Sequence, residues 1–231
     1  MKKFLAMLLS AALLCPAMAM AEDTIKIGIF EPMTGATAAG GSMEKEGFDL
    51  ANELYPDVLG KKIELVYGDN KSDRAEATLA AQSLVDKGVV AVLGSYGSGL
   101  SMAGGEVFAE NEIPALTATA TNPTITLDCE WYARICFIDP FQGTMLARYA
   151  VKNEYKKIAI MREKDSEYSV GLVKYFQDEI ATHDGYEVVA LCDFMNKDED
   201  FSALLGAVLD KKPDVIFTSV SYADKAAQIM K

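Results

Sequence analysis

The sequence predicts an α/β protein with two lobes, each built around a mostly parallel sheet. Short apolar runs alternate with longer stretches of helical periodicity along most of the 231 residues. The apolar runs are hydrophobic at nearly every position, which is typical of parallel strands that helices cover on both faces. The alternation starts again after "FIDPFQG" (residues 137–143), so a second lobe is expected from there.

The first predicted lobe contains four strands with helices between them. The predicted strands are the runs "IKIGIF", "KIELVYG", "VVAVLG" and "IPALTATA". Helices are expected over residues 43–54 and 73–87, and a third after the loop "GSYGSGLS" (residues 94–101). The second of these helices has the capping pair Asp73 and Glu76 at its start.

The second predicted lobe contains the strands "KIAIM", "YEVVALC" and "DVIFTSV". Helices are expected over residues 141–153, 168–182, 201–211 and 222–231, and Asp200 is expected to cap the third. Because the chain stops inside a helical pattern after only three strands, we expect this lobe to be incomplete. The predicted domains are therefore a signal peptide (1–21), a first lobe (22–140) and a partial second lobe (141–231).

The N-terminal residues have the features of a cleaved secretory signal peptide. Two lysines precede an apolar stretch, residues 4–15, which is too short to span a bilayer. Small residues at 17–21 offer cleavage sites, so the mature chain is expected to begin near Glu22, outside the cytoplasm. A lipoprotein signal ending at Cys15 is the alternative, but Leu14 stands where that signal requires a small residue.

Composition excludes several classes of partner. The formal net charge of −12 repels phosphate backbones and anionic lipids, so neither nucleic-acid nor membrane-surface binding is expected. Half of the residues are hydrophobic and 9% are aromatic, which argues against disorder.

Three cysteines remain after the signal peptide, at positions 129, 136 and 192. If the segment between the first two is extended, they lie beyond disulfide reach; a bridge would require the chain to fold back, and both alternatives stay open. No C-x-x-C pair occurs, so neither a zinc site nor a redox site is expected.

The loop "GSYGSGLS" is a candidate anion-binding site, because ligands of open parallel sheets bind beyond the carboxyl ends of the strands. Gly97 and Gly99 allow close approach of the backbone, and Ser98 can cap the following helix. The free N–H groups at the start of that helix can bind a carboxylate. The alternative is an ordinary turn with no ligand.

Two further groups of polar residues follow predicted strands. The hydroxyl-rich segment "TATATNP" (residues 117–123) can face a polar ligand, or can simply be a threonine-rich strand end. Tyr168 and Tyr222 stand at strand-to-helix junctions of the second lobe, where a ring can cover a ligand or pack in an interface.

Catalytic motifs do not fit, so no enzyme activity, metal or cofactor is expected. Neither Ser95 nor Ser98 completes a G-x-S-x-G elbow, and a dinucleotide-binding G-x-G-x-x-G would need glycine at Met102. His183 is the only histidine and lies in a predicted turn, so neither a Ser-His-Asp triad nor a metal site with several histidines is expected.

Taken in order, the segments "IGIFEPMTGATAAGG", "GSYGSGLS", "IPALTATATNP", "RICFIDPFQG", "REKDSEYSVGL" and "DEDFSALL" resemble the motifs of the periplasmic branched-chain amino-acid-binding proteins. These leucine/isoleucine/valine-binding proteins are the substrate-binding subunits of ABC importers. The resemblance implies two Rossmann-like lobes of the type I periplasmic binding fold that close over an amino acid. It also implies a monomer in the periplasm, which delivers its ligand to an ABC permease in the inner membrane.

The resemblance also suggests which residues bind the ligand. Ser98 resembles the serine that holds the ligand carboxylate, Thr121 a threonine at the ligand's polar end, and Thr119 would offer its backbone. Two tyrosines resemble the aromatic residues that reach in from the second lobe. The expected ligand-binding residues are Gly97, Ser98, Thr119, Thr121, Tyr168 and Tyr222.

The chain departs from this family pattern in two places. Leucine-binding members have a large aromatic residue in the loop after the first strand, but Gly40 stands there in this chain, which puts the leucine pocket in doubt and could leave room for a bulkier ligand. The acidic residue that binds the ligand's amino group would lie past Lys231. Alternatives from other classes are a receptor that senses amino acids or amides and reports to a signalling partner, and a hydrolase on the same fold.

Overall fold

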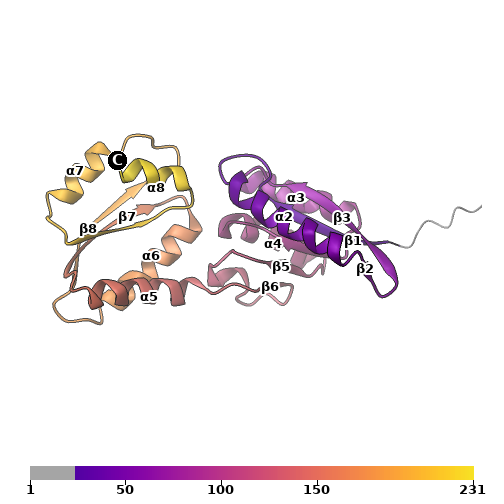
Figure 1. The fold of residues 1–231 in the computed structure, drawn as a ribbon, viewed down its shortest axis with the longest axis horizontal. Coiled ribbons are helices and arrows are strands. Elements are labelled where there is room, and N and C mark those ends of the chain that lie inside the picture. Colours follow the sequence, from indigo (N-terminus) through magenta and orange to yellow (C-terminus); the bar gives the residue numbers. More distant parts are fainter. Residues whose placement is uncertain (1–23) are drawn as a thin grey trace, which may run out of the picture.

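The computed structural model describes residues 24–231, so the predicted signal peptide lies outside the described residues. Two sheets with their helices lie one after the other along the long axis of the molecule (Figure 1). The first has six strands in the order β2-β3-β1-β4-β5-β6, and the second has three in the order β8-β7-β9. The predicted α/β class is therefore confirmed.

The first sheet is parallel except at one edge. Its strands are β1 (Ile25–Glu31), β2 (Asp57–Val58), β3 (Lys61–Asp69), β4 (Ala91–Gly94), β5 (Ala115–Thr117) and β6 (Tyr132–Arg134). β1 pairs in parallel with β3 and β4, and β5 pairs in parallel with β4 and β6, whereas β2 is antiparallel to β3. The sequence pattern missed β2 and β6, because strands this short carry too few residues to show a period.

The helices of the first lobe differ from the prediction mainly at their starts. They are α2 (Ala38–Leu54), α3 (Arg74–Asp86), α4 (Ser98–Glu110) and the short 3-10 helix η1 (Pro123–Ile125). The prediction that α2 begins at Met43 was wrong, since its first turn contains Gly40 and Gly41. Only half of the predicted capping pair forms: the Asp73 carboxylate accepts from the N–H groups of the first turn of α3, but Glu76 pairs with Lys71 instead.

The second lobe keeps the predicted alternation of helices and parallel strands. Its elements are α5 (Asp139–Lys152), β7 (Lys157–Glu163), α6 (Glu167–Ile180), β8 (Glu187–Phe194), α7 (Ser202–Leu209), β9 (Val215–Ser219) and α8 (Ala223–Ile229). Asp200 accepts from the Ser202 N–H, but the residue at the N-cap of α7 is Phe201, so Asp200 is not the cap. The predicted domain boundary after residue 140 falls in the first turn of α5 and stays a prediction.

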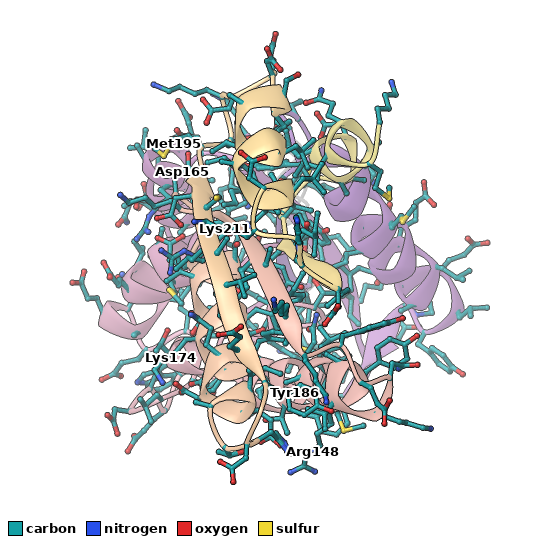
Figure 2. The ribbon with its side chains drawn as sticks, turned by 90° about the vertical axis from the view of Figure 1, so that its left-hand side faces the viewer. Arg148, Asp165, Lys174, Tyr186, Met195 and Lys211 are labelled. Atoms are coloured by element: carbon teal, nitrogen blue, oxygen red, sulfur yellow. The ribbon has the colours of Figure 1, made fainter. Side chains whose placement is uncertain are left out.

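Each lobe has its own hydrophobic core. In the first, the fully buried rings of Phe30 from β1 and Phe108 from α4 meet edge to face at 5.4 Å. In the second, Phe176 from α6 stacks on Phe217 from β9 at 4.1 Å. Figure 2 looks onto the outer end of the second lobe, where charged side chains such as Arg148 and Lys174 project outward from the ribbon.

Both sheets contain a point where the strand order reverses. β1 lies between β3 and β4, and β7 lies between β8 and β9. The connections that leave and return past β1 run to opposite sides, so the loops after β1 and β4 diverge and leave a crevice at the carboxyl ends of the strands. The loops after β7 and β9 do the same in the second lobe.

The three cysteines of the described chain are free, and the extended strand β6 separates Cys129 from Cys136. No helix within residues 24–231 is long and apolar enough to cross a membrane. In the same part of the chain, no cluster of three or more His, Cys, Asp or Glu residues is placed to hold a metal ion.

The cap of α3 yields the first testable prediction. We expect Asp73→Ala to lower the free energy of unfolding by about 1 kcal/mol, because two N–H groups of α3 lose their side-chain acceptor. Asp73→Ser should keep most of the stability, because serine is also a good cap. Chemical denaturation measures both variants, and equal stabilities for the alanine and serine variants would contradict this account.

Candidate functional site

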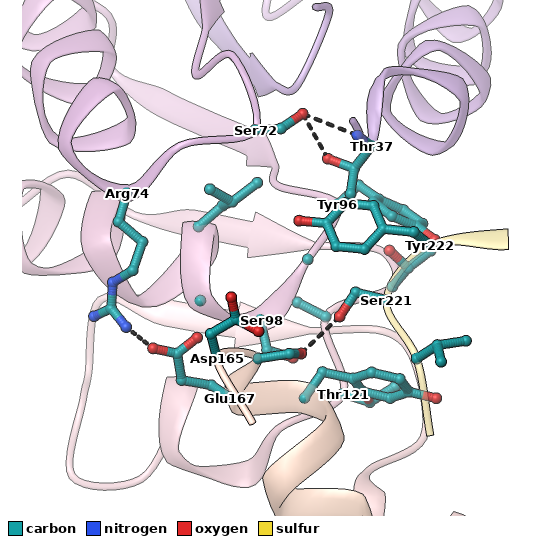
Figure 3. Close-up of a pocket in the computed structure, with 18 of the residues that line it drawn as sticks. Thr37, Ser72, Arg74, Tyr96, Ser98, Thr121, Asp165, Glu167, Ser221 and Tyr222 are labelled. Carbon is teal, nitrogen blue, oxygen red and sulfur yellow. Dashed lines mark hydrogen bonds and ion pairs between the residues drawn. The ribbon is translucent and has the colours of Figure 1, made fainter. Parts of the chain in front are cut away.

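A cavity of about 420 Å³ lies where the two crevices face each other (Figure 3). Segments after β1, β3, β4 and β5 line it from the first lobe, segments after β7 and β9 line it from the second, and Phe137 and Gln142 line it from the connection between the lobes. All six predicted ligand-binding residues lie in its wall: Gly97, Ser98, Thr119, Thr121, Tyr168 and Tyr222. The structure thus brings the predicted residues together from both lobes, and their binding roles stay predictions.

The N-terminus of α4 provides the most polar part of this wall. Gly97 is the N-cap and has a φ of +94°, a conformation that favours glycine. The prediction that Ser98 caps the helix was wrong: it is the first helical residue, 3% exposed, and its Oγ accepts from the Asn122 N–H at 3.3 Å. The first N–H groups of a helix have no acceptor within it, and the first turn of α4 holds no acidic residue. This helix start is therefore suited to an anion.

The two threonines after β5 play different parts. Thr121 is 7% exposed and lines the cavity, and its hydroxyl lies beside the Asp139 carboxyl without making a hydrogen bond of good geometry to it. A ligand that offers a better-aligned acceptor therefore gains a hydrogen bond from this hydroxyl. The Thr119 hydroxyl, by contrast, donates to Glu44 on α2, so this side chain is engaged by the protein itself.

The tyrosines of the second lobe are neutral hydrogen-bonding groups. The Tyr168 hydroxyl accepts from Gln142 Nε2 at 3.0 Å, and burial raises the pKa of this phenol. Burial and the nearby carboxylates of Glu163 and Asp165 raise the pKa of Tyr222 to about 12. Both hydroxyls therefore keep their protons at physiological pH and can donate to a ligand.

The lobes touch each other at one edge of the cavity. Arg74 of α3 forms an ion pair with Glu167 of α6 (Figure 3). Asn122 Nδ2 donates to the Glu167 carbonyl at 3.0 Å. The Glu167 carboxylate lies so close to Gly99 that a Cβ there would overlap its Oε2. Because the Arg74 side chain is 57% exposed, solvent screens the pair and it contributes at most about 1 kcal/mol.

Two buried carboxyl groups lie behind the cavity wall. Glu31, at the end of β1, accepts from the Tyr96 N–H at 2.8 Å, and Glu44 accepts from Thr119. Burial, reinforced by the charge of Glu44, raises the pKa of Glu31 to about 9, and burial also raises the pKa of Glu44. Their other oxygens, Glu31 Oε1 and Glu44 Oε2, have no further partner in the described chain. A proton shared between the two side chains satisfies both oxygens and links the loops after β4 and β5.

A third buried carboxyl belongs to Asp139, at the start of α5. Its N–H donates to the Thr121 carbonyl at 3.0 Å, and its carboxylate oxygens have no partner of good geometry within residues 24–231. Burial raises the pKa of Asp139 to about 6, against the opposing effects of the Thr121 hydroxyl and the Arg134 charge. Asp139 therefore titrates closer to neutral pH than an exposed aspartate, directly beside Thr121.

Sequence reasoning missed nine of the fourteen polar side chains in the cavity wall. The missed side chains are Thr37, Ser72, Arg74, Tyr96, Gln142, Asp165, Ser166, Glu167 and Ser221. Most of them follow a strand directly, so the rule that ligands bind beyond strand carboxyl ends would have found them once the strand order was known. Tyr96 lies within the loop "GSYGSGLS", but no pattern marked its side chain.

Two crevices that face each other across one cavity define a two-lobed protein of the α/β class. The family model described as "Periplasmic binding protein" matches residues 24–231, and the chain belongs to this family. The Leu/Ile/Val-binding protein BraC3 of Rhizobium johnstonii is 32% identical over 204 residues, which are 86% of this chain and 55% of that protein. The chain thus spans about half the length of the curated relatives it matches, as expected for an incomplete second lobe.

Two solved structures with different ligands are similar to this chain. The branched-chain amino acid transporter substrate-binding protein of Streptococcus pneumoniae, in complex with isoleucine, has a TM-score of 0.82 and 32% identity, over 89% of this chain and 59% of that one. A solute-binding protein of an ABC transporter from R. palustris, in complex with 4-hydroxybenzoate, has a TM-score of 0.79 and 26% identity, over 86% of this chain and 54% of that one.

The buried carboxyl pair predicts an unusual dependence of stability on pH. Because the pKa of Glu31 is higher in the folded chain than its ordinary 4.5, the folded state keeps a proton that the unfolded chain releases. We expect this contribution to the free energy of unfolding to be complete below about pH 4.5 and to be lost as the pH rises towards 9. One such proton gives a slope of about 1.4 kcal/mol per pH unit.

The variant that tests this is Glu31→Gln, whose amide can accept from Tyr96 and donate to Glu44 without titrating. Its unfolding free energy, measured by denaturant titration between pH 5 and 9, should fall less steeply with pH than that of the wild type. Glu112→Gln, which neutralises an exposed carboxylate, is the matched control and should keep the wild-type slope. Identical slopes for Glu31→Gln and the wild type would show that the pair is not protonated.

Proposed function

We propose that this protein is a periplasmic solute-binding protein that captures an amino acid, branched-chain or related, and delivers it to an ABC permease in the inner membrane. The observation that carries the proposal is the polar corner of the cavity. There, the free N–H groups of α4 and the Ser98 side chain lie beside the buried hydroxyl of Thr121, which makes no hydrogen bond of good geometry within residues 24–231. This corner is suited to the carboxylate of a small solute.

The ligands of the similar structures support a carboxylate anchor. Isoleucine has an ammonium group and a branched aliphatic side chain, whereas 4-hydroxybenzoate has a phenol ring and no amino group, and the charged group they have in common is a carboxylate. Hydrogen bonds to a charged group contribute about 1.5–3 kcal/mol each, more than neutral ones. The carboxylate is therefore the part of the ligand that we assign to Ser98, Thr121 and the α4 amides, with Thr119 offering its backbone.

Closure of the two lobes follows from where the ligand sits. Ser98 and Thr121 belong to the first lobe, whereas Tyr168 and Tyr222 belong to the second, so a bound solute contacts both lobes only when they meet. Ligand binding then shifts the population towards the closed form. The few weak contacts between the lobes, such as the exposed Arg74–Glu167 pair, leave this equilibrium to be set by the ligand.

We also propose that the protein is monomeric, has no catalytic activity and needs no cofactor. Its family consists of binding proteins, and the cavity wall contains neither histidine nor cysteine that could act as a base or a nucleophile. The cavity supplies hydrogen-bond donors and aromatic side chains, which are the groups that hold a solute.

The decisive experiment measures amino-acid binding by the intact protein and its Ser98→Ala variant. A thermal-shift screen against the common amino acids identifies the ligand, since binding to the native state raises the melting temperature. Calorimetry with that ligand should then show affinity reduced about 10- to 100-fold in Ser98→Ala, through loss of a charge-assisted hydrogen bond.

Ser202→Ala is the matched control, because Ser202 is also the first residue of a helix but is exposed and lies outside the cavity wall. This variant should bind as tightly as the wild type. Undiminished affinity in Ser98→Ala, or the absence of any amino acid or small carboxylate that binds the wild type, would overturn the proposed function.

A further inference from the structure

We propose that Tyr96 is the specificity-determining residue of the cavity: its ring, seated against Gly40, is the wall that limits the size of the ligand's side chain. The inference rests on the proposed function, because it concerns the part of the solute that extends beyond the carboxylate. We also infer that the ligand's side chain is apolar and of limited size. The reason is that the Tyr96 ring and Leu100 line the cavity from the same loop and helix as Ser98.

Gly40 lets the ring stand where it does. A Cβ at this position would lie 2.6 Å from Cε2 and Cζ of Tyr96, so the ring rests directly on the backbone of the first turn of α2. From the sequence, Gly40 was expected to leave room for a bulkier ligand. In the structure, the Tyr96 ring from the loop after β4 occupies the space beside Gly40. The helix cannot retreat from that ring, because a Cβ at Gly41 would already overlap the Pro32 carbonyl oxygen.

The backbone beneath the ring is held firmly. The Tyr96 N–H donates to Glu31 Oε2 at 2.8 Å. The carbonyl of the preceding residue, Ser95, accepts from the hydroxyls of Ser101 at 2.9 Å and Thr117 at 3.1 Å. With the backbone fixed, a group that pushes on the ring can move it only by turning the side chain towards the cavity.

The position of the ring relative to the carboxylate site gives it its role. Tyr96 precedes Ser98 by two residues in the same held loop, and Figure 3 shows its ring projecting into the cavity near Ser98. A ligand whose carboxylate binds at Ser98 therefore meets this wall at a fixed distance along its side chain. Pockets of this kind discriminate by about 10- to 200-fold for a methylene group.

A double-mutant cycle tests the contact. The probes are the amino acids alanine, valine, leucine and phenylalanine, and their Kd values are measured by calorimetry on the intact protein. The quantity compared between variants is the Kd of the largest amino acid that binds divided by the Kd of the smallest. Tyr96→Ala removes the wall and should shift this ratio at least tenfold in favour of the larger side chain. Gly40→Ala pushes the ring into the cavity and should shift the ratio in the opposite direction.

In the Tyr96→Ala background, Gly40→Ala should have no further effect on the ratio, because no ring is left for the methyl group to displace. Gly47→Ala is the matched control: it is a glycine of the same helix, an added Cβ there would have nothing within 4 Å, and its ratio should equal that of the wild type. Tyr96→Leu keeps an apolar side chain on Gly40 and should shift the ratio in the direction of Tyr96→Ala, by less.

The outcomes separate this inference from the proposed function. If amino acids bind the wild type but Tyr96→Ala weakens all of them equally, or Gly40→Ala acts alike in both backgrounds, the inference is wrong and the proposed function stands. If none of the amino acids or small carboxylates binds the wild type, both fail together.

Discussion

The structure of the site depends on how firmly the loop between β4 and α4 is held. The buried Ser95 lies at its centre: its carbonyl accepts two side-chain hydroxyls, and its own hydroxyl accepts from Asn70 Nδ2 at 2.9 Å. Glu31 fixes the next N–H, at Tyr96. The partners in these bonds belong to β1, to β5, to α4 and to the residue that follows β3, so the loop is anchored to the sheet on both sides. This loop fixes the positions of Ser98, the N–H groups at the start of α4 and the Tyr96 ring.

Two of the side chains that hold the site in place, Glu31 and Glu44, are buried carboxyl groups. An isolated pair of buried carboxylates would be strongly unfavourable, but a proton retained between Glu31 and Glu44 removes one of the two charges and ties β1 to α2. Through Tyr96 and Thr119, the pair also holds the loops after β4 and β5. In the second lobe, Glu163 accepts from the Ser221 N–H at 2.6 Å at the corresponding strand end, so both crevices are braced by a carboxyl from their central strand.

The sequence predicted the parts of the fold that repeat and missed those that depend on distant contacts. Long strands such as β1 and β7 could be predicted because most of their residues are apolar, as buried strands require. The start of α2 was missed because Gly40 and Gly41 are poor helix formers, and what requires glycine there is the closeness of Tyr96 and Pro32. The site residues were found through a family resemblance and the strand-end rule. The seat of Tyr96 on Gly40 joins residues far apart in the chain, which no local pattern encodes.

The central claim is that a carboxylate binds at the start of α4, between Ser98 and Thr121. The most direct measurement compares the affinity of the intact protein for its tightest-binding amino acid with that for the carboxamide of the same amino acid, which keeps the shape but lacks the negative charge. The account predicts that the amide binds at least about tenfold more weakly, since it loses charge-assisted hydrogen bonds at the helix start. Equal affinity for the two would contradict it.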